Sequence, residues 1–227
     1  MPFQDLPARL AEVRERIELA VERGGHGQTV TIVAVTKTYG PDAPVAAWDA
    51  GLKDVGENKV QEAVSKMPEV TMPLRWHLIG HLQRNKVKQL DGFHLVHSMD
   101  SARLADALAS YGLARGRPVD VLLQVNVSGE GTRGGYESAD VEREATRLKG
   151  FAGLAVRGVM TMAPFDASDV TLRGVFRGAR ESAALLRAAG HPATELSMGM
   201  SGDYEVAVEE GATLARLGTV LFGARST

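Results

Sequence analysis

The chain has 227 residues, a formal net charge of -2 and a hydrophobic content of 44%. This charge argues against nucleic-acid binding, which calls for a basic stripe, and the length allows one large domain or two small ones. The lack of cysteine excludes disulfides and thiolate metal sites. No apolar run approaches a membrane span and no signal-peptide pattern opens the chain, so we expect a cytoplasmic protein.

Helix-like and strand-like segments alternate from one end of the chain to the other. The opening segment predicts a helix, with Leu6, Leu10, Val13, Ile17 and Ala20 at helical spacing. Strands are predicted at 30–37, 53–57, 76–80, 94–98, 119–127, 155–162, 195–200 and 213–222. Helices are predicted between them at 41–51, 58–68, 82–91, 101–115, 137–150, 168–190 and 202–211.

This alternation requires a parallel sheet with helical crossovers, which is the α/β class. Eight strand units in such a chain fit a closed (β/α)8 TIM barrel with an additional N-terminal helix. No linker or composition break divides the chain, so residues 1–227 are expected to form a single domain. An open doubly wound sheet is the alternative, because it uses the same alternation.

Lys37 ends the first predicted strand, a β-branched and nearly all-apolar segment. An amine at the carboxyl end of a buried strand is a candidate nucleophile, because desolvation lowers its pKa. The alternative is that Lys37 only begins a solvated loop. In a barrel the active site is built at these strand ends, which favours the first interpretation.

The seventh and eighth strands end in small, amide-presenting segments on adjacent units. Met200, Ser201 and Gly202 precede a short helix, and Gly218 with Thr219 follows the last strand. Barrel enzymes commonly hold a phosphate between these two loops, so the pair predicts an anion site. The alternatives are an ordinary helix N-cap at Ser201 and tight packing at Gly218.

Arg216 lies on the face of the last strand that we assign to the barrel interior. A guanidinium there needs an acceptor, either an inward carboxylate or a heteroatom of a ligand. A lysine amine, a phosphate cradle and an inward arginine on one rim suit pyridoxal 5'-phosphate (PLP), which has an aldehyde, a phosphate and a ring nitrogen. Arginine donates to an unprotonated ring nitrogen, so it weakens the cofactor as an electron sink.

Several motifs in the same order resemble those of the pyridoxal-phosphate homeostasis protein family, which is related to the barrel domain of bacterial alanine racemases. The resemblance runs from about residue 8 to 225. Its motifs are Val33-Ala-Val-Thr-Lys37, Gly56-Glu-Asn-Lys-Val-Gln-Glu62, Trp76-His-Leu-Ile-Gly-His-Leu-Gln-Arg-Asn-Lys86, His97-Ser98, Asn126-Val-Ser128 with Glu130, Gly158-Val-Met160, Ser197-Met-Gly-Met-Ser201, Arg216-Leu-Gly-Thr219 and Phe222-Gly-Ala-Arg225.

The resemblance implies an alanine-racemase-like barrel of PLP fold type III that binds the cofactor covalently through Lys37 as an internal aldimine. It implies that Arg216 faces the pyridine nitrogen and that Asn58 lies beside the cofactor. The other implied cofactor-binding residues are Met200, Ser201, Gly218 and Thr219. The family is thought to buffer or deliver PLP without established turnover, so apo PLP-dependent enzymes are possible partners. A barrel with covered faces predicts a monomer.

Two positions depart from the family pattern. Lys59 stands where the family usually has an aromatic residue, so the wall near Asn58 is expected to differ. Arg133 stands where the family often has lysine, and a guanidinium cannot form a Schiff base. Covalent hand-off of the cofactor at that position is therefore not expected.

An amino-acid racemase is the main alternative function, since it also uses a barrel lysine. It needs a second acid/base on the opposite face, for which Tyr39, Tyr136 and Tyr204 are the local substitutes. A nicotinamide-binding enzyme is a weaker alternative, because Gly129-Glu-Gly-Thr-Arg-Gly134 matches the dinucleotide fingerprint without opening a helix at once.

Metal catalysis is the third alternative. His77 and His81 are four residues apart, which on a strand separates them by roughly 13 Å. His94 and His97 flank another strand end. Packing or hydrogen-bonding roles are therefore predicted for these histidines, and no metal site.

Overall fold

The computed structural model describes residues 3–131 and 134–223. Its strands close into the predicted parallel barrel, because β4 pairs with β5 as well as with β3, and β9 pairs with β1. The barrel strands are β1 (Thr31–Val35), β2 (Asp54–Glu57), β3 (Arg75–Leu78), β4 (Phe93–Met99), β5 (Val119–Asn126), β7 (Leu154–Met160), β8 (Glu195–Ser197) and β9 (Leu214–Leu217). The short β6 (Tyr136–Glu137) pairs only with β5. The open doubly wound alternative is therefore wrong.

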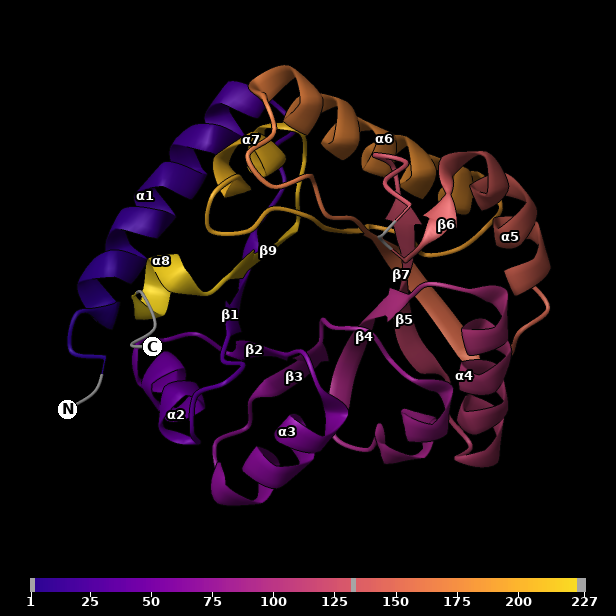
Figure 1. The fold of residues 1–227 in the computed structure, drawn as a ribbon, viewed down its shortest axis with the longest axis horizontal. Coiled ribbons are helices and arrows are strands. Elements are labelled where there is room, and N and C mark those ends of the chain that lie inside the picture. Colours follow the sequence, from indigo (N-terminus) through magenta and orange to yellow (C-terminus); the bar gives the residue numbers. More distant parts are fainter. Residues whose placement is uncertain (1–2, 132–133, 224–227) are drawn as a thin grey trace.

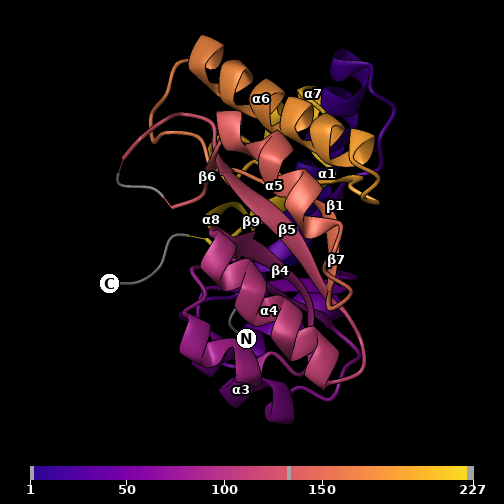
Figure 2. The same cartoon turned by 90° about the vertical axis from the view of Figure 1, so that its right-hand side faces the viewer.

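Helices cover the outside of the barrel (Figure 1). The α-helices are α1 (Leu6–Gly24), α2 (Asp42–Asp49), α3 (Val60–Lys66), α4 (Ala102–Ala114), α5 (Val141–Leu148), α6 (Asp169–Ala188), α7 (Tyr204–Glu209) and α8 (Thr219–Phe222). Short 3-10 helices are η1 (Met67–Glu69), η2 (Arg84–Gln89) and η3 (Ser138–Asp140). Figure 2 shows α4, α5 and α6 over β5 and β7. Within the described residues, no helix has both the length and the apolar content that a bilayer crossing needs.

The additional N-terminal helix α1 packs beside α7 and α8 (Figure 1). Its buried residues are the predicted stripe, Leu6, Leu10, Val13, Ile17 and Ala20. Arg23 ties its last turn to Glu209 of α7 through an ion pair of 2.5 Å. Gly25 then ends the helix in the left-handed conformation, with φ of 67°.

Strand alternation divides the side chains between two layers. One face of each strand packs against the helices in a large outer core, which includes Ile32 and Ala34 of β1. The other face points into the barrel, where a smaller apolar cluster gathers. Its members are Val33, Leu95, Leu122, Met160 and Leu214. Buried polar side chains also lie in the interior, and they matter for the site described below.

Two predicted elements differ from the structure. The segment predicted as a helix at 82–91 is the 3-10 helix η2, in which Lys86 donates its amide to Gln83. The strand predicted at 213–222 stops at Leu217, because the carbonyl of Gly218 accepts the amides of Leu221 and Phe222 and starts α8. The apolar sequence after Gly218 is that of a buried helix turn, which periodicity cannot separate from a strand at this length.

Candidate functional site

Four neighbouring strands bring the predicted site residues to one rim of the barrel. The order β2, β1, β9, β8 places the loops after these strands side by side. Those loops carry Asn58, Lys37, the pair Gly218 and Thr219, and the pair Met200 and Ser201, respectively. Because all four strands are parallel, their carboxyl ends meet at the same mouth.

The backbone on both sides of Lys37 is fixed by α3. The carbonyl of Thr36 accepts a hydrogen bond of 3.0 Å from Nζ of Lys66, and the amide of Thr38 donates to Glu62. Thr38 has φ of 69°, a left-handed conformation that ends the strand. Lys37 itself is half-buried, and alternation from Val33 places it on the inner face.

A buried charge pair lies beneath this turn. Glu57 is fully buried and accepts hydrogen bonds from Nζ of Lys66 (2.8 Å) and from the hydroxyl of Thr36 (2.6 Å). Burial raises the pKa of Glu57, while these hydrogen bonds oppose the rise. Sequence reasoning missed this cluster, although the spacing of Glu62 and Lys66 is typical of a helix-face pair. Its effect is to hold the Lys37 turn in one geometry.

Ser201 joins the loops after β8 and β9. Its Oγ accepts the amides of Gly218 and Val220, each at 3.3 Å. The N-cap of the following helix α7 is Asp203, so the interpretation of Ser201 as an ordinary N-cap is wrong. The serine hydroxyl instead presents a polar centre between two adjacent turns.

The glycines of this rim differ in what their neighbours require. A Cβ added at Gly218 would lie 3.5 Å from Val35, an ordinary contact, and one at Gly202 would meet nothing within 4 Å. Tight packing therefore does not explain Gly218. Gly199 is different, because its φ is 89° and a Cβ would lie 2.7 Å from Ala207. The space beside Gly202 and Gly218 leaves room for a ligand to approach the backbone.

Met200, Asn58 and Thr219 lie on the loops of the same rim. The amide of Met200 donates to Asp203 at 2.6 Å, and Met200 is 39% exposed. Asn58 is half-buried, and its backbone packs so closely on Gly80 that a Cβ there would lie 2.3 Å from the Asn58 carbonyl. Thr219 is exposed at the start of α8.

Arg216 points into the barrel below the rim and is 4% exposed. Its guanidinium donates to the carbonyl (2.7 Å) and hydroxyl (2.6 Å) of Ser197 and to the carbonyl of Thr161 (2.9 Å). Among the residues that the structure describes, no carboxylate forms an ion pair with it. Burial lowers the pKa of Arg216 to about 10, although the nearby Asp203 charge opposes this.

Polar side chains continue behind Arg216 through the barrel interior. Nδ1 of His97 lies 2.8 Å from Oγ of Ser197, and Nε2 of His97 lies 2.9 Å from Nδ1 of His77. Nε2 of His77 lies 2.9 Å from Oδ1 of Asp54. We call Asp54, His77, His97 and Ser197 the inner polar chain.

The hydrogen-bonding role predicted for His77 and His97 is confirmed. No group of side chains within residues 3–131 and 134–223 has the arrangement of a metal site. Asp54 and Ser197 were missed by sequence reasoning. The signal that could have found them is a polar residue at an inward position of a strand, on the same face as an apolar neighbour.

The remaining predicted features belong to the Gly-rich segment after β5 and to the loop after β2. Gly129 follows β5, and its amide donates to Asn126 at 3.1 Å. The described part of the Gly-rich segment leads into β6 rather than opening a helix, unlike a dinucleotide fingerprint. Arg133 lies outside the described residues. Lys59 is the exposed N-cap residue of α3.

The barrel is closed and parallel, with a lysine just after its first strand and small, amide-presenting turns after its last two. The family described as alanine racemase, N-terminal domain, matches residues 9–226. Two curated relatives carry the name pyridoxal phosphate homeostasis protein. The one from Aquifex aeolicus is 41% identical over 221 residues, which cover 96% of this chain and 97% of the relative. The one from Pseudomonas aeruginosa is 40% identical, covering 95% and 94%.

The chain therefore belongs to the pyridoxal phosphate homeostasis protein family. A solved structure agrees with this assignment. PipY from Synechococcus elongatus PCC7942, solved with PLP bound, superposes with a TM-score of 0.85 at 36% identity. The match covers 96% of this chain and 100% of that chain.

Proposed function

We propose that this protein binds PLP at the rim formed by the loops after β1, β2, β8 and β9, and acts in PLP homeostasis. The observation that carries the proposal is the Ser201 hydroxyl between the amides of Gly218 and Val220, next to the strand that leads to Lys37. The names of the relatives and the PLP-bound structure of PipY support it.

The residues of the rim fit the three functional groups of this cofactor. PLP supplies an aldehyde that condenses with a primary amine to a Schiff base with loss of water. Lys37 provides that amine on the inner face, from a turn that Lys66 and Glu62 hold in place. Ser201, Gly218 and Thr219 would hold the phosphate, with the hydroxyl of Ser201 and the amide of Thr219 as donors beside the open backbone of Gly218.

Arg216 sets the chemistry that the cofactor can perform. Its guanidinium is held by Ser197 and Thr161 below the rim, where it would face the ring nitrogen, and Asn58 and Met200 would lie beside the cofactor. A donor that stays charged leaves the ring nitrogen unprotonated and weakens the electron sink. We therefore expect a protein that holds PLP and passes it on to apo enzymes, as a cytoplasmic monomer, rather than a general catalyst.

The racemase alternative gains little from the described tyrosines. Tyr136 donates its hydroxyl to Glu144 at 2.8 Å, and Tyr204 is buried in the outer core. The ring of Tyr39 packs between Phe3 and Phe222. We expect L-alanine incubated with the PLP-loaded protein in deuterated water to exchange its Cα proton no faster than with free PLP. Exchange at enzymatic rates, followed by proton NMR, would restore the racemase function.

The absorption spectrum tests the cofactor and its anchor. We expect purified protein incubated with PLP to show a visible absorption band, and borohydride reduction to leave a phosphopyridoxyl adduct on Lys37 by mass spectrometry. Lys37→Ala should lose both signals and keep its circular dichroism spectrum, because Lys37 is a half-buried turn residue. Lys59→Ala, an exposed lysine on the next loop, is the matched control and should keep both. A wild-type protein that stays colourless and unmodified contradicts the proposal.

A further inference from the structure

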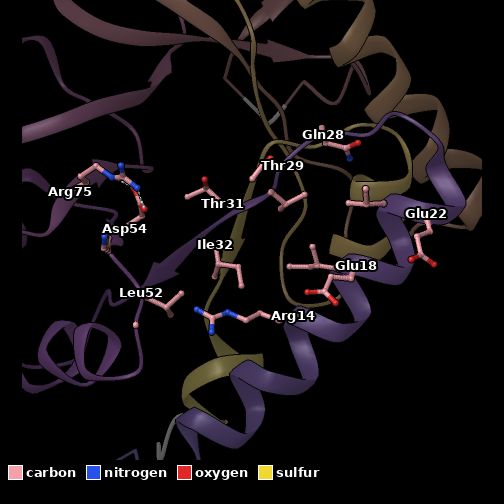
Figure 3. A pocket seen from close by; sticks show the side chains of 15 residues that line it. Arg14, Glu18, Glu22, Gln28, Thr29, Thr31, Ile32, Leu52, Asp54 and Arg75 are labelled. Carbon is pink, nitrogen blue, oxygen red and sulfur yellow. Dashed lines mark hydrogen bonds and ion pairs between the residues drawn. The ribbon is translucent and has the colours of Figure 1, made fainter.

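The inner polar chain crosses the barrel from one mouth to the other. It begins at Asp54, the first residue of β2, and ends at Ser197, which contacts Arg216 below the rim. At the Asp54 end, Arg75 donates hydrogen bonds of 2.7 and 2.5 Å to the carboxylate. Figure 3 shows this pair on one side of a cavity of about 710 Å³, with Arg14 of α1 on the other side.

When both imidazoles are neutral, the groups at the two ends of the inner polar chain allow its hydrogen bonds to point in only one direction. Arg216 can only donate, so Oγ of Ser197 accepts from it. Ionised Asp54 can only accept, so Nε2 of His77 carries the proton at that end. Nδ1 of neutral His77 then accepts from Nε2 of His97.

The same reasoning fixes the last link. Nδ1 of neutral His97 has no proton, so it accepts the hydroxyl of Ser197 at 2.8 Å. Every hydrogen bond therefore points from Arg216 toward Asp54, and both histidines are Nε2–H tautomers. Hydrogen bonds aligned in series polarise one another in a low dielectric, so a charge at one end is felt at the other.

We propose that the inner polar chain positions Arg216 and carries the charge of Asp54, at the amino-terminal mouth, to the guanidinium that faces the cofactor. His77, His97 and Ser197 are positioning residues, because they act on the cofactor only through Arg216. The part of the proposal that concerns the cofactor rests on the proposed function. The order of protons in the chain does not.

The surroundings of His97 support a neutral imidazole in the inner polar chain. His97 is buried, and that burial together with the charge of Arg216 holds its pKa well below the ordinary value. The ring of His94 on β4 lies 5.4 Å from that of His77, edge to face. Among the described residues, Arg75 from β3 contacts one end of the inner polar chain and Arg216 from β9 contacts the other, where Asp203 acts on Arg216.

Nitrogen-15 NMR of histidine-labelled protein tests the proton order without any cofactor. At about pH 8, where an ordinary histidine is neutral, we expect His77 and His97 to show an unprotonated Nδ1 and a protonated Nε2. A protonated Nδ1 on His97 overturns the proposal. Asp54→Asn removes the charge and lets the amide donate. The signals of His97, which is connected to Asp54 through His77 in the inner polar chain, should therefore shift. The milder Arg75→Gln keeps the carboxylate and should move them less.

Asp120→Asn is the matched control. Asp120 lies near the start of β5 in an ion pair of 2.5 Å with Arg157, outside the inner polar chain. It should leave the His97 signals unchanged. Equal shifts in Asp54→Asn and Asp120→Asn overturn the proposal.

PLP titration of the same variants tests the connection to the cofactor. We expect Asp54→Asn to weaken PLP binding about fivefold, as for a typical coupling between sites, and Asp120→Asn to leave it unchanged. If the wild type binds no PLP, the proposed function fails while the NMR result still decides the proton order. If the NMR order holds and Asp54→Asn binds PLP like the wild type, transmission to Arg216 is wrong.

Discussion

At the scale of single residues, the site depends on side chains that reach from one barrel unit into the next. Ser201 follows β8 but accepts amides from the turn after β9. Lys66 belongs to α3 but holds the carbonyl of Thr36 after β1. Such cross-unit hydrogen bonds fix the relative positions of rim loops before a ligand arrives, which reduces the entropy that binding must remove.

Ser201→Ala tests this role. The variant loses the hydroxyl that accepts two amides and that would donate to the phosphate. Because the lost hydrogen bond to the phosphate is worth about 1 kcal/mol, we expect PLP affinity to fall roughly tenfold. Titration of the visible band measures the effect. Ser168→Ala is the control, because its hydroxyl caps α6 by accepting the amide of Thr171. It should lower the unfolding free energy by about 1 kcal/mol and leave PLP affinity unchanged. The same affinity in Ser201→Ala and wild type would contradict the assigned role.

The sequence predicted the residues of the rim better than their partners. Lys37, Ser201 and Arg216 could be placed because each ends or lines a strand whose apolar pattern is clear. Asp54 and Ser197 were missed, since the alternation that marks an inward position is a weak signal in a short strand. Their partners come from β3, β4 and β9, and pairing at such a sequence distance leaves no local pattern.

At the scale of elements, two helix glycines have opposite roles that the sequence alone does not distinguish. Gly112 in α4 packs on the turn before β7, where an added Cβ would lie 2.0 Å from the carbonyl of Gly153. Gly174 in α6 has nothing within 4 Å of the same atom. The first glycine is needed for close packing of a helix on the barrel. The second only weakens its helix.

Alanine at the two positions should therefore change stability in opposite directions. Gly112→Ala is expected to lower the free energy of unfolding by about 1–3 kcal/mol through overpacking. Gly174→Ala should raise it by about 0.5–1 kcal/mol, because alanine is the better helix former. Urea denaturation of both variants measures these changes. Destabilisation by both would show that α6 cannot accept the extra methyl group.

The elements themselves were largely predictable from periodicity and turn residues. The alternation of strands and helices predicts the closed barrel, and the apolar stripe predicted for α1 is its buried face. Errors fell where a short apolar run follows a glycine, as after Gly218, and where a connection is too short for α-helical spacing, as in η2. In both places tertiary burial decides the conformation.

At the scale of the whole molecule, the polar interior makes stability depend on pH. The pKa of His97 is lowered by burial, and that of His94 is lowered as well, so the folded state binds fewer protons than the unfolded state below about pH 6.5. Burial alone raises the pKa of Asp54, but hydrogen bonds from His77 and Arg75 bring it below its ordinary value. Each of these groups stabilises the fold above its unfolded pKa and loses that contribution as the pH falls.

We therefore expect the free energy of unfolding to decrease from pH 6.5 downward, by up to about 1.4 kcal/mol per pH unit for one shifted histidine. Urea denaturation between pH 5 and 8 measures the slope. His97→Gln, which can still donate and accept hydrogen bonds, should flatten it. His81→Gln is the control, because the His81 side chain is 70% exposed, and it should keep the wild-type slope. Equal slopes in wild type and His97→Gln would contradict the linkage.

The inner polar chain also constrains how this barrel can change over evolutionary time. The inner polar chain consists of Asp54, His77, His97 and Ser197. An apolar residue at any one of these positions leaves a buried polar neighbour without its hydrogen-bond partner, at a cost of about 1–3 kcal/mol. If all four residues are replaced together, only Arg75 and Arg216 lose hydrogen-bond partners. Relatives are therefore expected to keep the whole set or to have exchanged it as a block, passing through few viable single substitutions. The polar positions of the barrel interior are therefore expected to change together, whereas positions on the outer helices can change one at a time.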